Sequence, residues 1–562
     1  MHDLVIRGGR VVDGTGAPAR TADIAIDGDR ISEVGAAVGA GRREIRADGA
    51  LVTPGFVDIH THYDGQATWD SLLTPTTWHG VTTTVFGNCG VGFAPVRAPD
   101  AGFLINLMEG VEDIPGTVLA EGIDFCWESF PQYLDALAAK PHALDIGAQV
   151  PHTALRFYVM GERGADHAQQ PTAEELAKMG ELLEEALHAG ALGLSTSRTT
   201  KHRARDGRVT PSLSAGEPEL AALAGAMKRA GRGVLEVNSD FGEGDFEKLQ
   251  AAAALSGRPM SLLLIQVDND PGLWRRTLDN VHAARRAGLD VTAQVGTRPI
   301  GVLLGFEATL HPFARHPAWL EIAGLPPAER IARLRADAAL RARLVDERPD
   351  DAYTRNQFKM LHRAFVLSDR PDYEPTPEQA IVARAQREGV SPWALALEAL
   401  MAHDGRGLLL HPFENYNAGN LDVVREMIAD PYTVMGVGDG GAHVGTICDA
   451  SGPTFLLQHW ARERSRGERL PLELLVRKQT RDSAMSYGLA DRGVLAPGFK
   501  ADLNVIDFDR LAVRKPEIVY DLPAGGKRFI QRADGYLHTF VSGVETLADD
   551  ELTGALPGRL LR

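Results

Sequence analysis

Cysteine is scarce in this sequence: only Cys89, Cys126 and Cys448 occur in 562 residues. An odd and sparse set of cysteines argues against a disulfide framework and fits a reducing compartment. The start of the sequence has no basic region followed by a long apolar segment, and no stretch approaches the roughly 20 apolar residues needed to span a bilayer. We therefore expect a cytoplasmic protein with no membrane partner.

Runs of basic residues are also lacking. Lys and Arg number 59 against 75 Asp and Glu, which gives a formal net charge of -16 and a pI near 5.6. This balance opposes binding to a nucleic-acid backbone, so we expect no nucleic-acid partner. The apolar fraction of 44% is that of an ordinary globular protein, and the length allows more than one domain. The oligomeric state stays open, a homo-oligomer included.

The two ends of the chain share a β-rich texture. Residues 4–35 alternate short apolar runs with the turn signals Asp13-Gly14 and Asp27-Gly28, which are typical of hairpins. Similar runs return after residue 490. The simplest packing joins residues 1–55 and 495–562 into one composite β-sandwich domain beside the middle of the chain.

The middle, residues 56–494, alternates apolar runs with amphipathic helical stretches. Strands that alternate with helices over this length predict an α/β fold with a parallel sheet, and here a (β/α)8 TIM-like barrel. Residues 306–400 do not follow the alternation, because they are helical and rich in Ala, Arg and Leu. They indicate a helical insertion, either a lid or an ordinary solvated helical layer.

Two histidines, His60 and His62, stand one residue apart at the end of the apolar run from Phe56 to Ile59. The run indicates a buried strand, and alternate residues of a strand point the same way. Both imidazoles should therefore aim at one point, which suits a divalent metal. In the alternative interpretation, one histidine packs in the core and the other caps a loop.

Several motifs in order along nearly the whole chain carry a family resemblance. The stretches that carry it are Leu4-Val-Ile-Arg-Gly-Gly-Arg-Val-Val-Asp-Gly-Thr-Gly, Thr53-Pro-Gly-Phe-Val-Asp-Ile-His-Thr-His, Phe86-Gly-Asn-Cys-Gly, Gly190-Ala-Leu-Gly-Leu-Ser-Thr-Ser, Gly436-Val-Gly-Asp-Gly-Gly-Ala-His and Gly493-Val-Leu-Ala-Pro-Gly-Phe-Lys-Ala-Asp-Leu. With these motifs the chain resembles the amidohydrolase superfamily and, within it, the N-acyl-D-amino-acid deacylases, or D-aminoacylases.

The resemblance implies a metal-dependent barrel that hydrolyses an amide. By position, His60, His62, Cys89 and Asp439 are similar to the family's metal ligands, with Asp439 also the general base. Imidazole and thiolate ligands suit zinc, and we expect one zinc ion rather than two. Bound metal would activate a water molecule, and Asp439 would take its proton. Otherwise Cys89 is a small buried hydrophobe and Asp439 a turn residue between glycines.

Two further ligands of the family are missing. The family has one histidine after the fifth strand and another after the sixth, but residues 233–241 and 261–269 contain none. Substitute ligands could come from these stretches, or the first four ligands could suffice, with help from His411. Alternatively the protein is a catalytically silent barrel. The candidate substitutes are Glu236, Asn238, Asp240, Gln266 and Asp268.

The substrate side is altered as well. Where the deacylases have a basic residue after the sixth-strand histidine, this chain has Gln266-Val-Asp268. A basic cluster at residues 198–205 follows a predicted strand and could grip a substrate carboxylate, unless it is only a solvated loop. The candidate substrate contacts are Arg198, Lys201, His202, Arg203, Gln266 and His411.

We therefore expect a hydrolase that cleaves a linear amide C–N bond, with a small-molecule N-acyl-(D-)amino acid as substrate. The alternatives are an amidohydrolase acting on a cyclic amide, carbamate or lactone, and a silent ligand-binding barrel.

Overall fold

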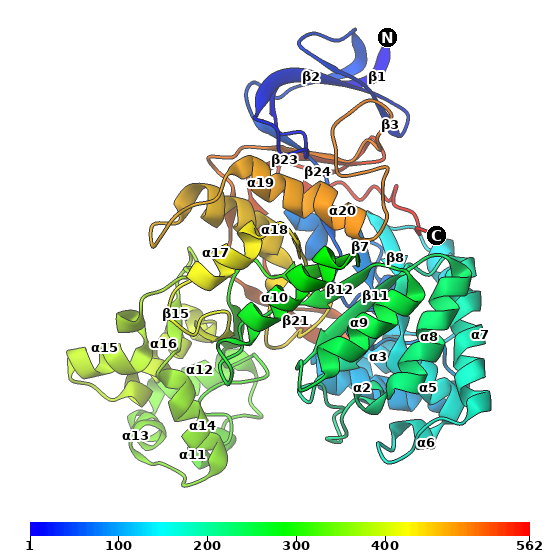
Figure 1. The fold of residues 1–562 in the computed structure, drawn as a ribbon. Helices are drawn as coiled ribbons and strands as arrows, with labels where there is room; N and C mark the ends of the chain where they lie inside the picture. Colours follow the sequence, from blue (N-terminus) through cyan, green and yellow to red (C-terminus); the bar gives the residue numbers. More distant parts are fainter.

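The computed structural model describes residues 1–562 and has a parallel β-barrel at its centre (Figure 1). Its eight strands are β6 (Phe56–Asp58), β7 (Val81–Phe86), β8 (Asp145–Ala148), β10 (Gly193–Arg198), β11 (Val234–Ser239), β12 (Met260–Leu263), β13 (Val291–Val295) and β17 (Thr433–Met435). Three of them pair in the order β6-β7-β8, and the other five pair in the order β17-β13-β12-β11-β10, with a short ninth strand beside β10. The short strand β9 (Val150–Pro151) follows β8 after one residue, and a parallel bridge between Thr61 and Gly440 closes the other seam.

Helices cover the outside of the barrel, as predicted, among them α7 (Ala173–Ala189), α8 (Glu217–Ala230), α9 (Asp245–Ser256), α10 (Leu273–Arg286) and α17 (Asp422–Ala429). Residues at the helix ends mark where these helices begin and end, as α7 shows. The Thr172 side chain accepts the Glu175 N–H at 3.2 Å, and the Glu175 carboxylate accepts the Thr172 N–H at 2.8 Å. This capping box begins α7, and Gly190 ends it.

Both chain ends contribute to a nine-stranded sheet, in agreement with the prediction that they join in one β unit. Its order is β25-β24-β23-β18-β5-β1-β2-β3, and β4 pairs with β1. The two ends meet where β5 (Leu51–Pro54) pairs antiparallel with β18 (Leu503–Ile506). The remaining members are β1 (His2–Val11), β2 (Arg20–Asp27), β3 (Arg30–Gly35), β4 (Gly41–Arg46), β23 (Tyr536–Val541), β24 (Val544–Ala548) and β25 (Glu551–Leu552).

A helical insertion stands between β13 and β17 and projects from the barrel at the lower left of Figure 1. It is framed by β14 (Ile300–Leu304), β15 (Phe365–Leu367) and β16 (Leu408–Glu414). A separate cluster of 20 buried hydrophobic residues, Trp319 and Trp393 among them, forms its core. Its helices are α11 (Pro317–Leu320), α12 (Pro327–Ala336), α13 (Ala338–Asp346), α14 (Ala352–Leu361), α15 (Ile381–Glu388) and α16 (Pro392–Gly405).

None of the helices combines the length and the hydrophobicity that crossing a membrane requires.

Candidate metal centre

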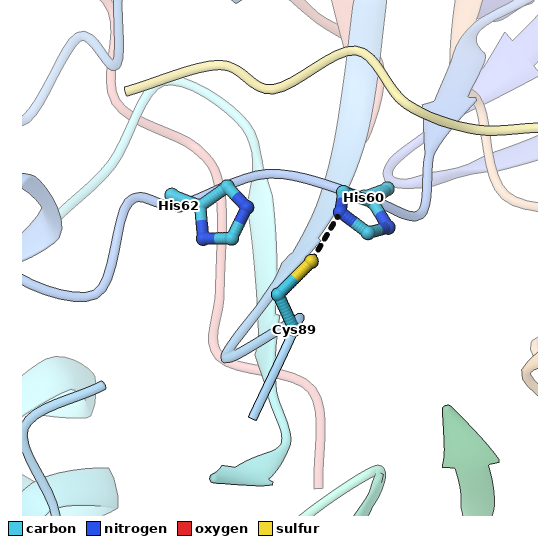
Figure 2. Close-up of side chains that lie close together, drawn as sticks. All are labelled: His60, His62 and Cys89. Atoms are coloured by element: carbon cyan, nitrogen blue, oxygen red, sulfur yellow. Dashed lines mark hydrogen bonds between the residues drawn. The ribbon is translucent and has the colours of Figure 1, made fainter. Parts of the chain in front are cut away.

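His60 and His62 come shortly after β6, which ends at Asp58, and their imidazoles face a common point with Cys89 (Figure 2). The two ring centroids are 5.5 Å apart, at an interplanar angle of 71°. Both residues are buried, with 0% and 2% of their surface exposed. The alternation of side chains along the chain thus brings the two rings together as the sequence predicted.

Cys89 and Asp439 come from two other strand ends and meet the histidines. The Cys89 Sγ lies 3.4 Å from His60 Nε2, and ligand atoms of His60, His62 and Cys89 all lie within 4.8 Å of one another. Asp439 Oδ1 is 3.5 Å from His60 Nε2 and 3.8 Å from His62 Nε2. A tetrahedral zinc ion with bonds of 2.0–2.3 Å holds its ligand atoms roughly 3.3–3.8 Å apart. The separations of 3.4, 3.5 and 3.8 Å between these donor atoms lie in this range.

The Gly87-Asn-Cys-Gly90 motif places the thiol. Cys89 has a φ of 54° and Gly90 a φ of 67°, so two successive residues adopt left-handed conformations. A Cβ at position 90 would lie 2.6 Å from the Ser197 backbone nitrogen, which explains the glycine. The Asn88 side chain donates to the Thr61 carbonyl at 3.1 Å and thereby ties the motif to the residue between the two histidines.

The Gly438-Asp-Gly440 motif likewise has a packing reason. Asp439 has a φ of 47°, and its N–H donates to the His60 carbonyl at 3.0 Å. A Cβ at position 438 would lie 2.3 Å from Asp58 Oδ2, and one at position 440 would lie 2.5 Å from Thr76 Oγ1. Only glycines allow Asp439 to approach the histidines so closely.

A second layer of contacts orients the imidazoles. His60 Nδ1 is 2.8 Å from Gln294 Oε1, while Gln294 Nε2 donates to Ser261 Oγ at 2.9 Å. Because the amide oxygen faces His60, Nδ1 carries the proton. The lone pair of His60 Nε2 then points towards Cys89 and Asp439. His62 Nδ1 faces Glu112 Oε1 at 3.4 Å. Such outer contacts set the tautomer of metal-binding histidines.

Acidic groups gather here without basic partners. Glu112, Glu236 and Asp439 form ion pairs only with histidines. Burial raises the pKa of Glu236 to about 8 and lowers the pKa of His60 to about 4. Burial and neighbouring carboxylates hold the pKa of the Cys89 thiol well above its ordinary value. A divalent cation would supply the missing positive charge and reverse these shifts, so the residues fit a metal.

A cavity of about 510 Å³ opens in front of these donors. Lys201 and His202 from the predicted basic cluster line it, as do Asn238 and Asp240 from the stretch after the fifth strand. Glu236 lies behind the donors, where its carboxylate accepts the Cys89 N–H at 3.0 Å.

Other predicted contacts lie elsewhere. Arg198 Nε donates to Asp245 at 2.7 Å and its Nη1 donates to the Ala215 carbonyl, so its guanidinium points away from the cavity. Arg203 is exposed and donates to the Gly207 carbonyl at 3.1 Å. The expectation that these arginines reach the cavity is not met, because nearby carboxylate and carbonyl oxygens hold them outside.

Gln266, Asp268 and His411 also lie outside the cavity. The Gln266 N–H donates to Asn415 Oδ1 at 2.8 Å, which ties this residue to the segment after β16. Asp268 and His411 line a different cavity, between the barrel and the insertion, where Asp268 pairs with Arg363. Packing against the insertion therefore takes these three residues out of reach of the donors.

An amide stands near the place of a missing histidine. Asn238 on β11 has its Nδ2 3.3 Å from Cys89 Sγ and 3.3 Å from His202 Nε2. His202 Nδ1 in turn lies 2.9 Å from Ser197 Oγ. The end of β11 thus supplies an amide rather than a histidine to the cavity, and the loop after β10 supplies the imidazole of His202.

Sequence reasoning missed Glu112, Gln294 and His443. Glu112 ends α2 (Ala101–Glu112), Gln294 lies on β13, and His443 follows Asp439 by four residues. His443 Nε2 is 3.5 Å from Glu112 Oε2, and both residues line the cavity. The only signal was the closeness of His443 to Asp439 in the Gly-Asp-Gly-Gly-Ala-His stretch.

Comparisons with known proteins show which proteins this chain resembles over its full length. D-aminoacylase of Alcaligenes xylosoxydans xylosoxydans is 28% identical over 100% of this chain and 97% of its own length, and the N-acyl-D-glutamate deacylase of the same organism is 29% identical over 100% and 96%. A solved structure of a D-aminoacylase with a binuclear metal centre superposes with a TM-score of 0.67 and 25% identity over the full length of both chains.

A structure of N-acyl-D-glutamate deacylase from Bordetella bronchiseptica, complexed with zinc and a phosphonate inhibitor, gives a TM-score of 0.66 at 25% identity, over 100% of this chain and 99% of that one. The family model of the amidohydrolases matches residues 43–547, which include all eight barrel strands. The chain belongs to the amidohydrolase family.

Proposed function

We propose that this protein hydrolyses the linear amide C–N bond of an N-acyl amino acid, with the D-configuration as the first to test, in a metal-dependent reaction. The observation that carries the proposal is the convergence of four metal donors from three strand ends at the floor of one cavity. Membership of the amidohydrolase family and the full-length likeness to deacylases support it.

One zinc ion is the metal that this donor set suits best. His60, His62, Cys89 and Asp439 would hold it, since imidazole and thiolate ligands favour zinc. When bound, such an ion lowers the pKa of water to about 7 and polarises a carbonyl oxygen.

Asp439 is the general base in this proposal. Its carboxylate lies beside both Nε2 atoms at the cavity floor, where it can take a proton from the attacking water and return it to the leaving nitrogen. The hydrogen bond from the Asp439 N–H to the His60 carbonyl holds the Asp439 backbone next to His60, and the carboxylate thereby stays beside the imidazoles. Gln294 and Glu112 hold the rings of His60 and His62 in the orientation that this step requires.

Lys201 and His202 are the proposed substrate contacts, because both line the cavity. The Nζ of Lys201 pairs with the carboxylate of Glu414, so a substrate carboxylate would share that ammonium.

The experiment is a turnover panel with the zinc-loaded protein. It would contain N-acetyl-D- and N-acetyl-L-amino acids beside cyclic imides, with product amine measured for the first group and ring opening for the second. Turnover of N-acetyl-amino acids supports the proposal. Turnover of cyclic imides alone would replace it with a cyclic amidohydrolase, and the absence of bound zinc would favour a silent ligand-binding barrel.

A further inference from the structure

The walls of the metal cavity are rich in carboxylates and poor in cations. Lys201 is the one lysine among the lining residues, and no arginine lines it. The other basic side chains of the wall are four histidines, His60, His62, His202 and His443. The carboxylates are Glu112, Asp240, Asp270, Glu414 and Asp439.

The single lysine is already engaged. Its Nζ forms an ion pair with Glu414, which stands at the end of β16 with a side chain only 10% exposed. The glutamate is fixed by its strand, whereas the lysine is a flexible loop residue with a side chain 52% exposed. Any substrate carboxylate that reaches Lys201 must therefore compete with a carboxylate of the protein itself.

Asp240 adds a second negative charge, beside that of Glu414, to the residues that line the cavity. Its carboxylate accepts the Thr199 hydroxyl at 2.6 Å, and the Thr200 N–H and hydroxyl at 2.8 and 2.9 Å. Burial alone would raise the pKa of Asp240, but these hydrogen bonds and Lys201 outweigh it and hold the pKa below its ordinary value. Asp240 is thus ionised near neutral pH, although its hydrogen-bond donors are neutral groups.

Of the nearby arginines, only Arg276 offsets a carboxylate of the cavity wall, that of Asp270. Arg198 is committed to Asp245, and Arg363 pairs with Asp268 in the neighbouring cavity. Arg276 pairs with Asp270 at the surface and does not line the metal cavity. One ammonium, that of Lys201, is left to face Asp240, Glu414 and the α-carboxylate that an N-acyl amino acid brings.

We infer that the cavity selects N-acyl amino acids whose side chain is neutral or basic and rejects those whose side chain is acidic. The inference rests on the proposed deacylation and narrows its substrate class. A second carboxylate on the substrate has no cation to receive it and meets Asp240 and Glu414 instead. An ammonium or guanidinium on the side chain meets the same two carboxylates as partners.

The test compares kcat/KM of the zinc-loaded protein for the N-acetyl derivatives of lysine, methionine and glutamate, all of the enantiomer that it turns over. We expect the lysine and methionine compounds to exceed the glutamate compound at least about tenfold. Raising the ionic strength should lower the value for lysine and raise it for glutamate, because salt screens both the attraction and the repulsion. Equal values, or a preference for glutamate, overturn the inference.

The same three compounds are also titrated calorimetrically against the zinc-loaded protein. If none of them is turned over, the proposed function fails, but the order of binding still decides the inference. Binding of the glutamate compound as tightly as the lysine compound would overturn it.

Two variants test whether Glu414 and Asp240 cause the discrimination against acidic side chains. Glu414→Gln frees Lys201, and Asp240→Asn removes the second charge, so each should raise kcat/KM for the glutamate compound relative to the methionine compound at least about threefold. Glu181→Gln makes the same change of charge on α7, where the side chain is 68% exposed, and should leave the ratio unchanged. An unchanged ratio in both cavity variants, or an equal shift in the control, would overturn the assignment.

Discussion

Two walls of the metal cavity have opposite chemistry. The metal wall, formed by the ends of β6, β7 and β17, carries His60, His62, Cys89 and Asp439. The opposite wall, after β10 and β11, carries His202, Asn238 and Asp240. The first concentrates soft and anionic donors around one point, and the second offers an amide, a loop imidazole and a charged carboxylate. In the proposals above, one side of this barrel holds a cation and the other side selects the substrate.

The largest effect should come from the metal wall. His60→Ala and Cys89→Ala should each lose bound zinc and lower turnover at least about 1,000-fold, because removing a donor empties the site that activates water. Zinc per chain by mass spectrometry and initial rates measure this. His188→Ala is the matched control, since its side chain is 59% exposed on α7. Retention of zinc and turnover in Cys89→Ala would remove the thiol from the centre.

Asp439→Asn separates the two roles proposed for Asp439, metal ligand and general base. The amide keeps the size of the side chain but cannot take a proton, so we expect zinc to stay and turnover to fall about 10²- to 10⁴-fold. Parallel measurement of zinc content and kcat distinguishes the two roles. A wild-type kcat in this variant would exclude Asp439 as the general base.

Glu112→Gln tests the layer behind the metal wall. Glu112 faces His62 Nδ1 at 3.4 Å, and loss of its charge should weaken zinc binding about 10- to 100-fold. Competition with a chelator of known affinity gives the change. An unaltered zinc affinity would show that the orientation of His62 does not depend on this carboxylate.

Asn238→Ala should have a smaller effect on the metal. Its amide only contacts Cys89 Sγ and His202, so we expect zinc affinity to change less than about tenfold. The same chelator competition measures it. A loss as large as that of Cys89→Ala would make Asn238 a ligand and remove the distinction between the two walls.

The acidic groups should make zinc stabilisation depend on pH. Burial raises the pKa of Asp64 to about 7 and that of Glu236 to about 8, above the roughly 4 of unfolded carboxyl groups. At these two carboxyl groups the folded metal-free protein binds protons more tightly than the unfolded chain, so their contribution to its stability falls as pH rises from about 4 to 8. Zinc supplies the missing charge, and the gain in Tm on adding zinc should be larger at pH 8 than at pH 5.5. A gain that shrinks toward pH 8 would contradict this account.

How much of the site could be predicted depends on how each residue is placed. His60, His62, Cys89 and Asp439 lie in short motifs at strand ends, where local geometry decides the direction of the side chain. Glu112 reaches the site from the end of a helix, and packing between distant segments places it there. For Arg198 the sequence predicted the position at a strand end but not the direction of the side chain, which its pairing with Asp245 determines.

The barrel could be predicted from the alternation of strands and helices in residues 56–494, and the sheet from the β-rich texture of both chain ends. The closure of the barrel could not be inferred in this way, since the Thr61–Gly440 bridge joins residues far apart in sequence.

The central claim is that the thiol of Cys89 and the imidazoles of His60 and His62 share one cation. Cobalt(II) substitution followed by absorption spectroscopy tests it most directly. We predict about one cobalt ion per chain with a near-ultraviolet thiolate-to-cobalt band that disappears in Cys89→Ser. A bound ion without that band in the wild-type protein would contradict the claim.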